Sequence, residues 1–151
     1  MMKTVTSKVK PVPERYHSVN SYLVVQGVPK LLDFLKQTFN STELERVPRP
    51  DGTISHAEVR IGDSVVMMGE ASAQSKPMPA MLYVYVEDVD AVYKRALKAG
   101  AKSVRELKDE FYGDRAGGVE DPMGNQWWIA THKEDVSPEE LRLRMEAQNR
   151  A

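Results

Sequence analysis

The stretch that decides the fold occurs twice, as H-A-E-V-R-I-G-D-S-V-V-M-M-G-E (56–70) and as G-G-V-E-D-P-M-G-N-Q-W-W-I-A-T (117–131). Each copy has two apolar runs around a turn signal, Gly62-Asp63 in the first and Pro122-Met123-Gly124-Asn125 in the second. Turn residues between β-branched and aromatic runs predict β-hairpins. The copies lie 61 residues apart, so the hairpin belongs to an internal repeat.

The same spacing relates the segments that precede the hairpins. An amphipathic helix is expected to start near Val28 in the first copy, and another after Asp88, a suitable N-cap, in the second. Gly100 is placed to end the second helix in the left-handed conformation. The strands expected around these helices are 19–25 and 43–47 in the first copy, and 80–86 and 103–107 in the second.

The repeat predicts an α+β fold made of tandem βαβββ modules. They are expected to form a partly open, cup-shaped mixed sheet, with helices outside and a C-terminal helix after Ser137-Pro138. The small, polar and proline-bearing segment 71–79 separates the modules. The expected parts are an irregular N-terminal arm (1–15), a first module (16–75), a second module (76–133) and the C-terminal helix (134–151).

Composition excludes several classes of function. The chain has 151 residues, 41% of them hydrophobic and 28% charged, with a formal net charge of -1 and no cysteine. A near-neutral chain is not drawn to nucleic acid or to anionic lipid, and without cysteine there are no disulfides or thiolate ligands. No apolar run approaches the ~20 residues that cross a bilayer. We therefore expect a cytoplasmic protein with no nucleic-acid or membrane partner.

Strand alternation sorts the side chains of both modules onto two faces. The apolar face, expected to pack under the helices, carries Ala57, Val59, Ile61, Val66, Met68, Trp127 and Ile129. The opposite face carries Asn20, Tyr22, His56, Glu58, Arg60, Met67, Met81, Tyr83, Tyr85 and Trp128. Large aromatic rings with polar tips on this face indicate a concave surface that holds a partly apolar molecule. The alternative is that they fill a small core or a dimer interface.

Three stretches carry a family resemblance: Y-V-Y-V-E-D-V-D-A-V-Y-K-R-A-L-K-A-G-A (83–101), Y-G-D-R-A-G-G-V-E-D-P-M-G-N-Q-W-W-I-A-T-H (112–132) and residues 56–68. Together they resemble the vicinal oxygen chelate superfamily, which includes glyoxalase I, bleomycin and fosfomycin resistance proteins and extradiol dioxygenases. The PhnB-like branch is the most similar, and the resemblance covers about residues 16–133. It implies a homodimer of cup-shaped, partly open sheets.

The resemblance also implies where a metal would lie. Metal-using members hold a divalent ion with His, Glu or Gln at four positions, which fall here on Asn20, Met67, Met81 and Trp128. Thioethers and an indole are poor ligands for Mg²⁺, Zn²⁺ or Fe²⁺. We therefore expect no metal at these positions and no cofactor, with Trp128 providing a flat apolar wall instead.

Other polar residues allow more than one interpretation. His56 and Glu58 lie two apart on one strand face and could share a displaced metal, with His17, Glu70 or a partner subunit's residue as third ligand. An ion pair between Glu58 and Arg60 is the simpler interpretation. Asp114-Arg115 could clamp an anionic ligand, or could pair with neighbours to fix a loop. The histidines His17, His56 and His132 have no companion serine or carboxylate at an interpretable spacing.

The sequence thus predicts a metal-independent protein that binds a small, partly apolar or aromatic molecule, without an assigned reaction. The ten residues of the mixed face are the expected ligand contacts. The alternative is a divalent-metal-dependent lyase, isomerase or dioxygenase with a displaced metal site. A third possibility is an interaction protein whose cup is closed by its own side chains.

Overall fold

The computed structural model of the chain describes residues 8–150. A strand, a helix and three strands occur in that order twice, followed by one more helix, which confirms the tandem βαβββ modules. The elements are β1 (Ser21–Val25), α1 (Val28–Phe39), β2 (Thr42–Pro48), β3 (Ile54–Ile61), β4 (Ser64–Glu70), β5 (Met81–Tyr85), α2 (Val89–Lys98), β6 (Lys102–Asp109), β7 (Asp114–Glu120), β8 (Gln126–His132) and α3 (Pro138–Asn149).

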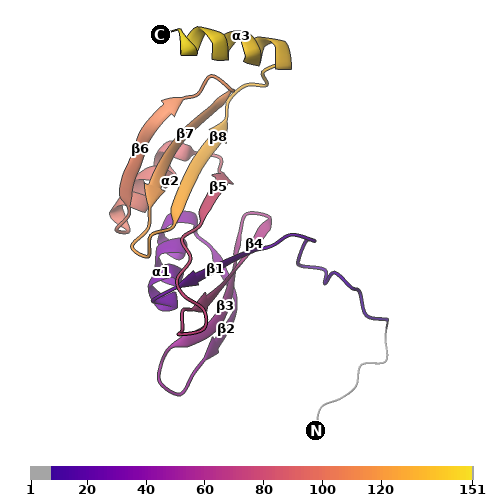
Figure 1. Cartoon of the computed structure of the whole chain (residues 1–151), viewed down its shortest axis with the longest axis vertical. Coiled ribbons are helices and arrows are strands. Elements are labelled where there is room, and N and C mark those ends of the chain that lie inside the picture. The colour runs from indigo at the N-terminus through magenta and orange to yellow at the C-terminus, as the bar shows by residue number, and fades with distance from the viewer. Residues whose placement is uncertain (1–7, 151) are drawn as a thin grey trace.

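The strands form two four-stranded sheets, in the order β1-β4-β3-β2 and β5-β8-β7-β6. In each sheet the leading strand pairs in parallel with the last one, and the other pairs are antiparallel, so both sheets are mixed. The two modules lie one above the other along the long axis of the molecule, and α1 contacts α2 where they meet (Figure 1). The predicted α+β fold class is confirmed.

The core lies between each sheet and its own helix. Alternation in the strands places one set of side chains under α1 and α2, where Leu31, Leu35 and Val92 pack against them. The predicted apolar face is confirmed, because every member is at most 9% exposed: Ala57, Val59, Ile61, Val66, Met68, Trp127 and Ile129. The opposite, or open, face of each sheet has no helix packed on it among the described residues.

The turn between β7 and β8 is built around one buried carboxylate. Asp121, 3% exposed, accepts hydrogen bonds from the backbone N–H and the side-chain amide of Asn125 at 3.0 and 3.1 Å. It also accepts the indole N–H of Trp127 at 2.9 Å, which satisfies the one polar atom of that buried ring. Since alternate residues point to opposite faces, Trp127 in the core leaves Trp128 on the open face.

The helices of the two modules are capped in different ways. Asp88 caps α2 by accepting the N–H of Ala91 at 3.1 Å, as predicted. The first residues of α1 are capped from a distance instead. Glu70, at the end of β4, accepts the N–H groups of Gly27 and Val28 at 2.9 and 3.1 Å. A carboxylate at this position satisfies unpaired helix donors and favours the positive end of the helix dipole.

The ends of the chain lie outside the two modules. Residues 1–7 of the expected N-terminal arm fall outside the described residues, and residues 8–20 contain no helix or strand. At the other end, Ser137 caps α3 as predicted, and Arg144 of α3 donates to the carbonyl oxygen of Phe111 at 3.2 Å and to Glu134. None of the described helices is long and apolar enough to cross a membrane.

Candidate functional site

The open faces of the two sheets carry matching rows of four residues, one from each strand. From the leading strand outward they are Tyr22, Met67, Glu58 and Glu45 in the first sheet, and Tyr83, Trp128, Gly118 and Arg105 in the second. Each row ends at a β-bulge, next to Glu43 in β2 and next to Ser103 in β6. Such bulges re-aim side chains.

The residues paired in these rows show that the offset between the two copies is not 61 residues throughout, as the sequence suggested. Tyr22 and Met67 match residues 61 positions later, but Glu58 matches Gly118 and not Val119. The reason is that nine residues separate the paired Gly118 and Trp128, whereas eight separate the paired Glu58 and Met67. The strands β3 and β7 are therefore offset by 60 residues.

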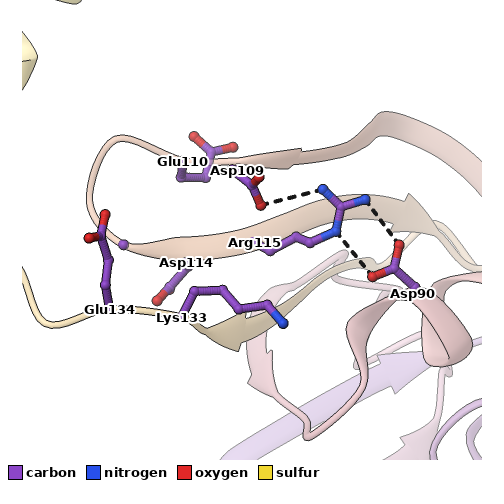
Figure 2. A pocket seen from close by; sticks show the side chains of 8 residues that line it. Asp90, Asp109, Glu110, Asp114, Arg115, Lys133 and Glu134 are labelled. Carbon is purple, nitrogen blue, oxygen red and sulfur yellow. Dashed lines mark hydrogen bonds and ion pairs between the residues drawn. The ribbon is translucent and has the colours of Figure 1, made fainter.

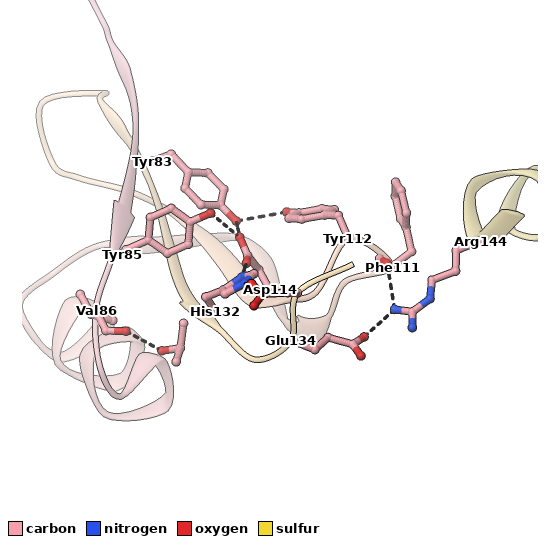
Figure 3. Close-up of polar contacts among 11 residues, drawn as sticks. Tyr83, Tyr85, Val86, Phe111, Tyr112, Asp114, His132, Glu134 and Arg144 are labelled. Atoms are coloured by element: carbon pink, nitrogen blue, oxygen red, sulfur yellow. Dashed lines mark hydrogen bonds and ion pairs between the residues drawn. The ribbon is translucent and has the colours of Figure 1, made fainter. Parts of the chain in front are cut away.

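Two tyrosines of β5 are fixed on the open face by a single carboxylate (Figure 3). Tyr83 and Tyr85 donate to the same oxygen of Asp114, at 2.7 and 2.9 Å, and their rings meet edge to face at 5.3 Å between centroids. Asp114 is 2% exposed, and its other oxygen lies 2.7 Å from Nδ1 of His132, its partner on β8. The remaining ring nitrogen of His132 lies 2.7 Å from Asp135.

These contacts set the charge state of the cluster. Burial raises the pKa of Asp114, but hydrogen bonds from His132, Tyr83 and Tyr85 outweigh burial, so its pKa lies below the ordinary value. Burial and the hydrogen bonds with Tyr112 and Asp114 raise the pKa of Tyr83, and the bond to Asp114 raises that of Tyr85. The tyrosines therefore remain neutral phenols at physiological pH, and offer ring surface and hydroxyl groups, not phenolate bases.

Trp128 lies flat on the same sheet. A methyl group at Gly118, opposite it on β7, would come within 2.8 Å of the indole, so the ring occupies the space that a side chain at this position would fill. The Arg105 guanidinium stands over the ring at 4.8 Å from the ring centre, in a cation–π contact. The indole N–H donates to Gln126 at 3.1 Å. The ring is held between Gly118 and the Arg105 guanidinium, and its role as the wall of a ligand site stays a prediction.

The open face of the first sheet carries a chain of polar contacts. The hydroxyl of Tyr22 lies 3.2 Å from Nδ1 of His56, and Nε2 of His56 lies 2.7 Å from Glu58. Glu58 is 4% exposed and also accepts from the Tyr16 hydroxyl and, at 3.1 Å, from Arg15. Burial raises the pKa of Glu58, but the hydrogen bonds of His56 and Tyr16 outweigh burial, so its pKa is lowered and the carboxylate is ionised.

Three other predicted ligand contacts, Met81, Met67 and Asn20, differ in exposure and in their partners. Met81 is largely exposed at the start of β5, and Met67 lies half-buried between Tyr22 and Glu58. Asn20 precedes β1, and its side chain bonds to the backbone of His17 at 3.1 and 2.7 Å, which closes a turn.

Two alternatives left open by the sequence are resolved by side-chain contacts. No ion pair joins Glu58 to Arg60 in residues 8–150, because Glu58 is already paired with Arg15. The second alternative concerns Arg115, which does not face an anion site. It binds Asp90 through two nitrogens, at 3.1 and 3.0 Å, and reaches Asp109 at 3.4 Å (Figure 2). Arg115 therefore joins α2 to the β6–β7 hairpin.

The pocket beside Arg115, about 660 Å³ in volume, is lined mainly by charged side chains. Its lining residues are Asp90, Asp109, Glu110, Gly113, Asp114, Arg115, Lys133 and Glu134. Acids outnumber bases in this lining, and Arg115 is already paired with two of them, whereas Lys133 forms no ion pair with the described residues.

Several residues that shape the open faces were missed by sequence reasoning. Asp114 and His132 were considered, but their contact across β7 and β8 depends on strand register. Glu45 was missed entirely, although one oxygen of Glu45, one of Glu58 and a ring nitrogen of His56 lie within 4.8 Å of one another. The alternation of T-E-L-E-R gave no usable signal, because a bulge falls between Glu43 and Glu45. Of the third ligands that were considered, Glu70 is engaged in capping α1.

Comparison with known proteins agrees with this architecture. Residues 15–129 match the model of the family described as Glyoxalase/Bleomycin resistance protein/Dioxygenase superfamily. The uncharacterized proteins Mb0911c of Mycobacterium bovis and Rv0887c of Mycobacterium tuberculosis are each 36% identical to this chain over 142 residues. These alignments cover 87% of the chain and 93% and 84% of the two relatives, respectively.

Solved structures share the fold. TioX from Micromonospora sp. ML1 has a TM-score of 0.62 and 28% identity, over 76% of this chain and 99% of that one. A PhnB protein from Bacillus cereus has a TM-score of 0.63 at 18% identity, over 76% of this chain and 99% of its own, and that likeness concerns the fold alone. The protein belongs to the glyoxalase/bleomycin resistance protein/dioxygenase superfamily.

Proposed function

We propose that the protein binds a small, partly apolar or aromatic molecule on the open faces of its sheets, by ring contact and hydrogen bonding, as a sequestering protein. The observation that carries this proposal is the fixed pair of Tyr83 and Tyr85. They are 41% and 62% exposed, yet both hydroxyls are bonded to Asp114. Exposed rings that are already ordered lose little further entropy when a ligand stacks on them.

The chemistry of the rows supports a ligand held by contact. At the positions where metal-using relatives carry ligands, this chain has Met67, Met81 and Trp128, whose side chains offer polarizable and aromatic surface. Polar groups beside that surface, the neutral phenols and His56, would orient a ligand by hydrogen bonds. The proposal requires no metal at these three positions or at Asn20, the fourth.

We also propose that a second copy of the chain covers the open faces. Four large side chains stand exposed on them: Tyr22, Met81, Tyr83 and Tyr85. Exposed apolar groups gathered on one surface are typical of an interaction site. A homodimer with two-fold symmetry would bury them and enclose a ligand between two sheets. Light scattering coupled to size exclusion should give twice the mass of the chain, and a monomeric mass would contradict this part of the proposal.

Ligand binding is tested with a broad screen of planar and amphipathic compounds, followed by thermal shift and by tryptophan fluorescence. A compound that raises the unfolding temperature should bind Trp128→Ala at least about tenfold more weakly, a loss of 1.4 kcal/mol. Trp128→Phe should retain part of the affinity. Leu143→Ala, which removes an exposed apolar side chain of α3, is the matched control. A hit that binds all four proteins equally would place the ligand elsewhere and contradict the proposal.

A further inference from the structure

A second kind of site lies at the other end of the first row, where Glu45 and Glu58 stand directly opposite each other on β2 and β3. Like charges at opposed positions of a sheet destabilise it. Glu58 is 4% exposed, and its carboxylate is contacted by His56, Tyr16 and Arg15. The β-bulge beside Glu43 turns Glu45 toward the same point. This arrangement calls for a cation between the two carboxylates.

Arg15 supplies that cation in the present structure. One guanidinium nitrogen lies 3.1 Å from Glu58 and 3.3 Å from Glu45. Arg15 belongs to residues 8–20, which form no helix or strand, and its side chain is 38% exposed. The contact with Glu45 is exposed and contributes about 0–1 kcal/mol, whereas the buried Glu58 carboxylate needs a cation beside it. A metal ion that contacts both carboxylates can therefore take the place of Arg15.

The arginine does not account for His56. Its Nε2 lies 2.7 Å from Glu58, and one ligand atom from each of Glu45, His56 and Glu58 falls within 4.8 Å of the others. Histidine nitrogen and carboxylate oxygen are both ordinary ligands of Zn²⁺, whereas Mg²⁺ and Ca²⁺ are bound by oxygen atoms, so the imidazole favours Zn²⁺. The Nδ1 of His56 faces the hydroxyl of Tyr22 at 3.2 Å. Once Nε2 bonds a metal, Nδ1 carries the proton and donates to that oxygen, which orients the ring.

We propose that Glu45, His56 and Glu58 bind one Zn²⁺ ion, which takes the place of the Arg15 guanidinium. The three residues are distinct from Asn20, Met67, Met81 and Trp128, where metal-using relatives carry their ligands. Three protein ligands leave a coordination position for water, and in zinc proteins such an open position accompanies chemistry. This site does not depend on the small-molecule binding proposed above.

The test is calorimetric titration of ZnCl₂ into the full-length chain, freed of any histidine tag and stripped with chelator. We expect one ion per chain. Glu45→Gln and His56→Gln should each weaken zinc binding by at least about tenfold. Mutating a residue that only supports a metal ligand already lowers metal affinity by roughly 10–100-fold. Glu43→Gln is the matched control, because Glu43 lies on the same strand, is exposed and pairs with Arg46. Arg15→Ala should tighten binding by removing the competing cation.

Two further measurements keep the result interpretable. Circular dichroism of each variant checks folding, and Glu45, which is exposed, is the position least able to disturb it. Co²⁺ replaces Zn²⁺ as a spectroscopic probe, and its visible absorption should change in His56→Gln if the imidazole is a ligand.

The proposal is overturned if wild type and Arg15→Ala both fail to bind, or if Glu43→Gln weakens binding as much as Glu45→Gln. Zinc binding that survives His56→Gln unchanged would also overturn it. None of these results bears on the compound screen.

Discussion

Gly118 and Trp128 lie opposite each other on β7 and β8, and the indole rests where a side chain at position 118 would stand. A methyl group there would approach the ring to 2.8 Å. We expect Gly118→Ala to displace the ring from the sheet and to lower the free energy of unfolding by about 1–3 kcal/mol, as overpacking does. Urea denaturation measures the loss. Trp128→Ala added to Gly118→Ala should recover part of it, and purely additive effects would show that the two side chains do not interact.

The contact between His132 and Asp114 makes stability depend on pH. The hydrogen bond to Asp114, followed by that to Asp135, raises the pKa of His132 above its ordinary value of 6.5. The folded state therefore binds the proton more tightly than the unfolded state. The resulting stabilisation is fully present below pH 6.5 and is lost as pH rises through the raised pKa.

His132→Gln removes this proton-linked stabilisation. The difference in unfolding temperature between wild type and His132→Gln should therefore be largest near pH 5.5 and should shrink toward pH 9. Asp135→Asn, which leaves the larger contribution of Asp114 in place, should keep most of the pH dependence. A wild-type advantage that stays constant from pH 5.5 to 9 would contradict this account.

Glu70 is expected to stabilise α1 from outside the helix. Glu70→Ala leaves the N–H groups of Gly27 and Val28 without their acceptor and should lower stability by about 0.5–2 kcal/mol, the range found for N-caps. Glu87→Ala is the control, because Glu87 is an exposed acid close to the start of α2. Equal unfolding free energies for Glu70→Ala and wild type would show that solvent caps α1 equally well.

Asp121 is expected to be the most sensitive turn residue. Asp121→Ala removes the acceptor of the buried Trp127 indole N–H and of the Asn125 backbone, and each unsatisfied buried group costs about 1–3 kcal/mol. Denaturation monitored by tryptophan fluorescence measures the effect. Asp109→Ala, an acid whose side chain is 79% exposed, should stay within about 0.5 kcal/mol of wild type. Comparable losses in the two variants would show that burial of the carboxylate is unimportant.

The fold was predictable because its signals are local and repeated. Alternation assigned Val59, Met68 and Trp127 to the core, and cap residues such as Asp88 fixed a helix start. Each of these signals depends on a few neighbouring residues. Because the pattern occurs twice in the sequence, it predicts two βαβββ modules.

The open faces were predictable only in part. Alternation placed Tyr83 and Trp128 correctly on the open face, because side-chain direction has a period of two. It could not show that Asp114 accepts hydrogen bonds from Tyr83 and Tyr85, which precede it in the sequence by 31 and 29 residues. It also could not place Glu45 opposite Glu58, because a bulge between Glu43 and Glu45 shifts the register of β2 against β3.

The bulges at Glu45 and Arg105 also matter for protein engineering. Both residues end their rows on outer strands, and neither belongs to the packed core. Exchanging either side chain alters what the adjoining surface recognises, but Arg105 also pairs with the buried carboxylate of Glu110, so a new partner for Glu110 has to accompany its exchange. The duplicated scaffold offers two adjustable positions, one acidic and one basic, from which new selectivity can be designed or selected.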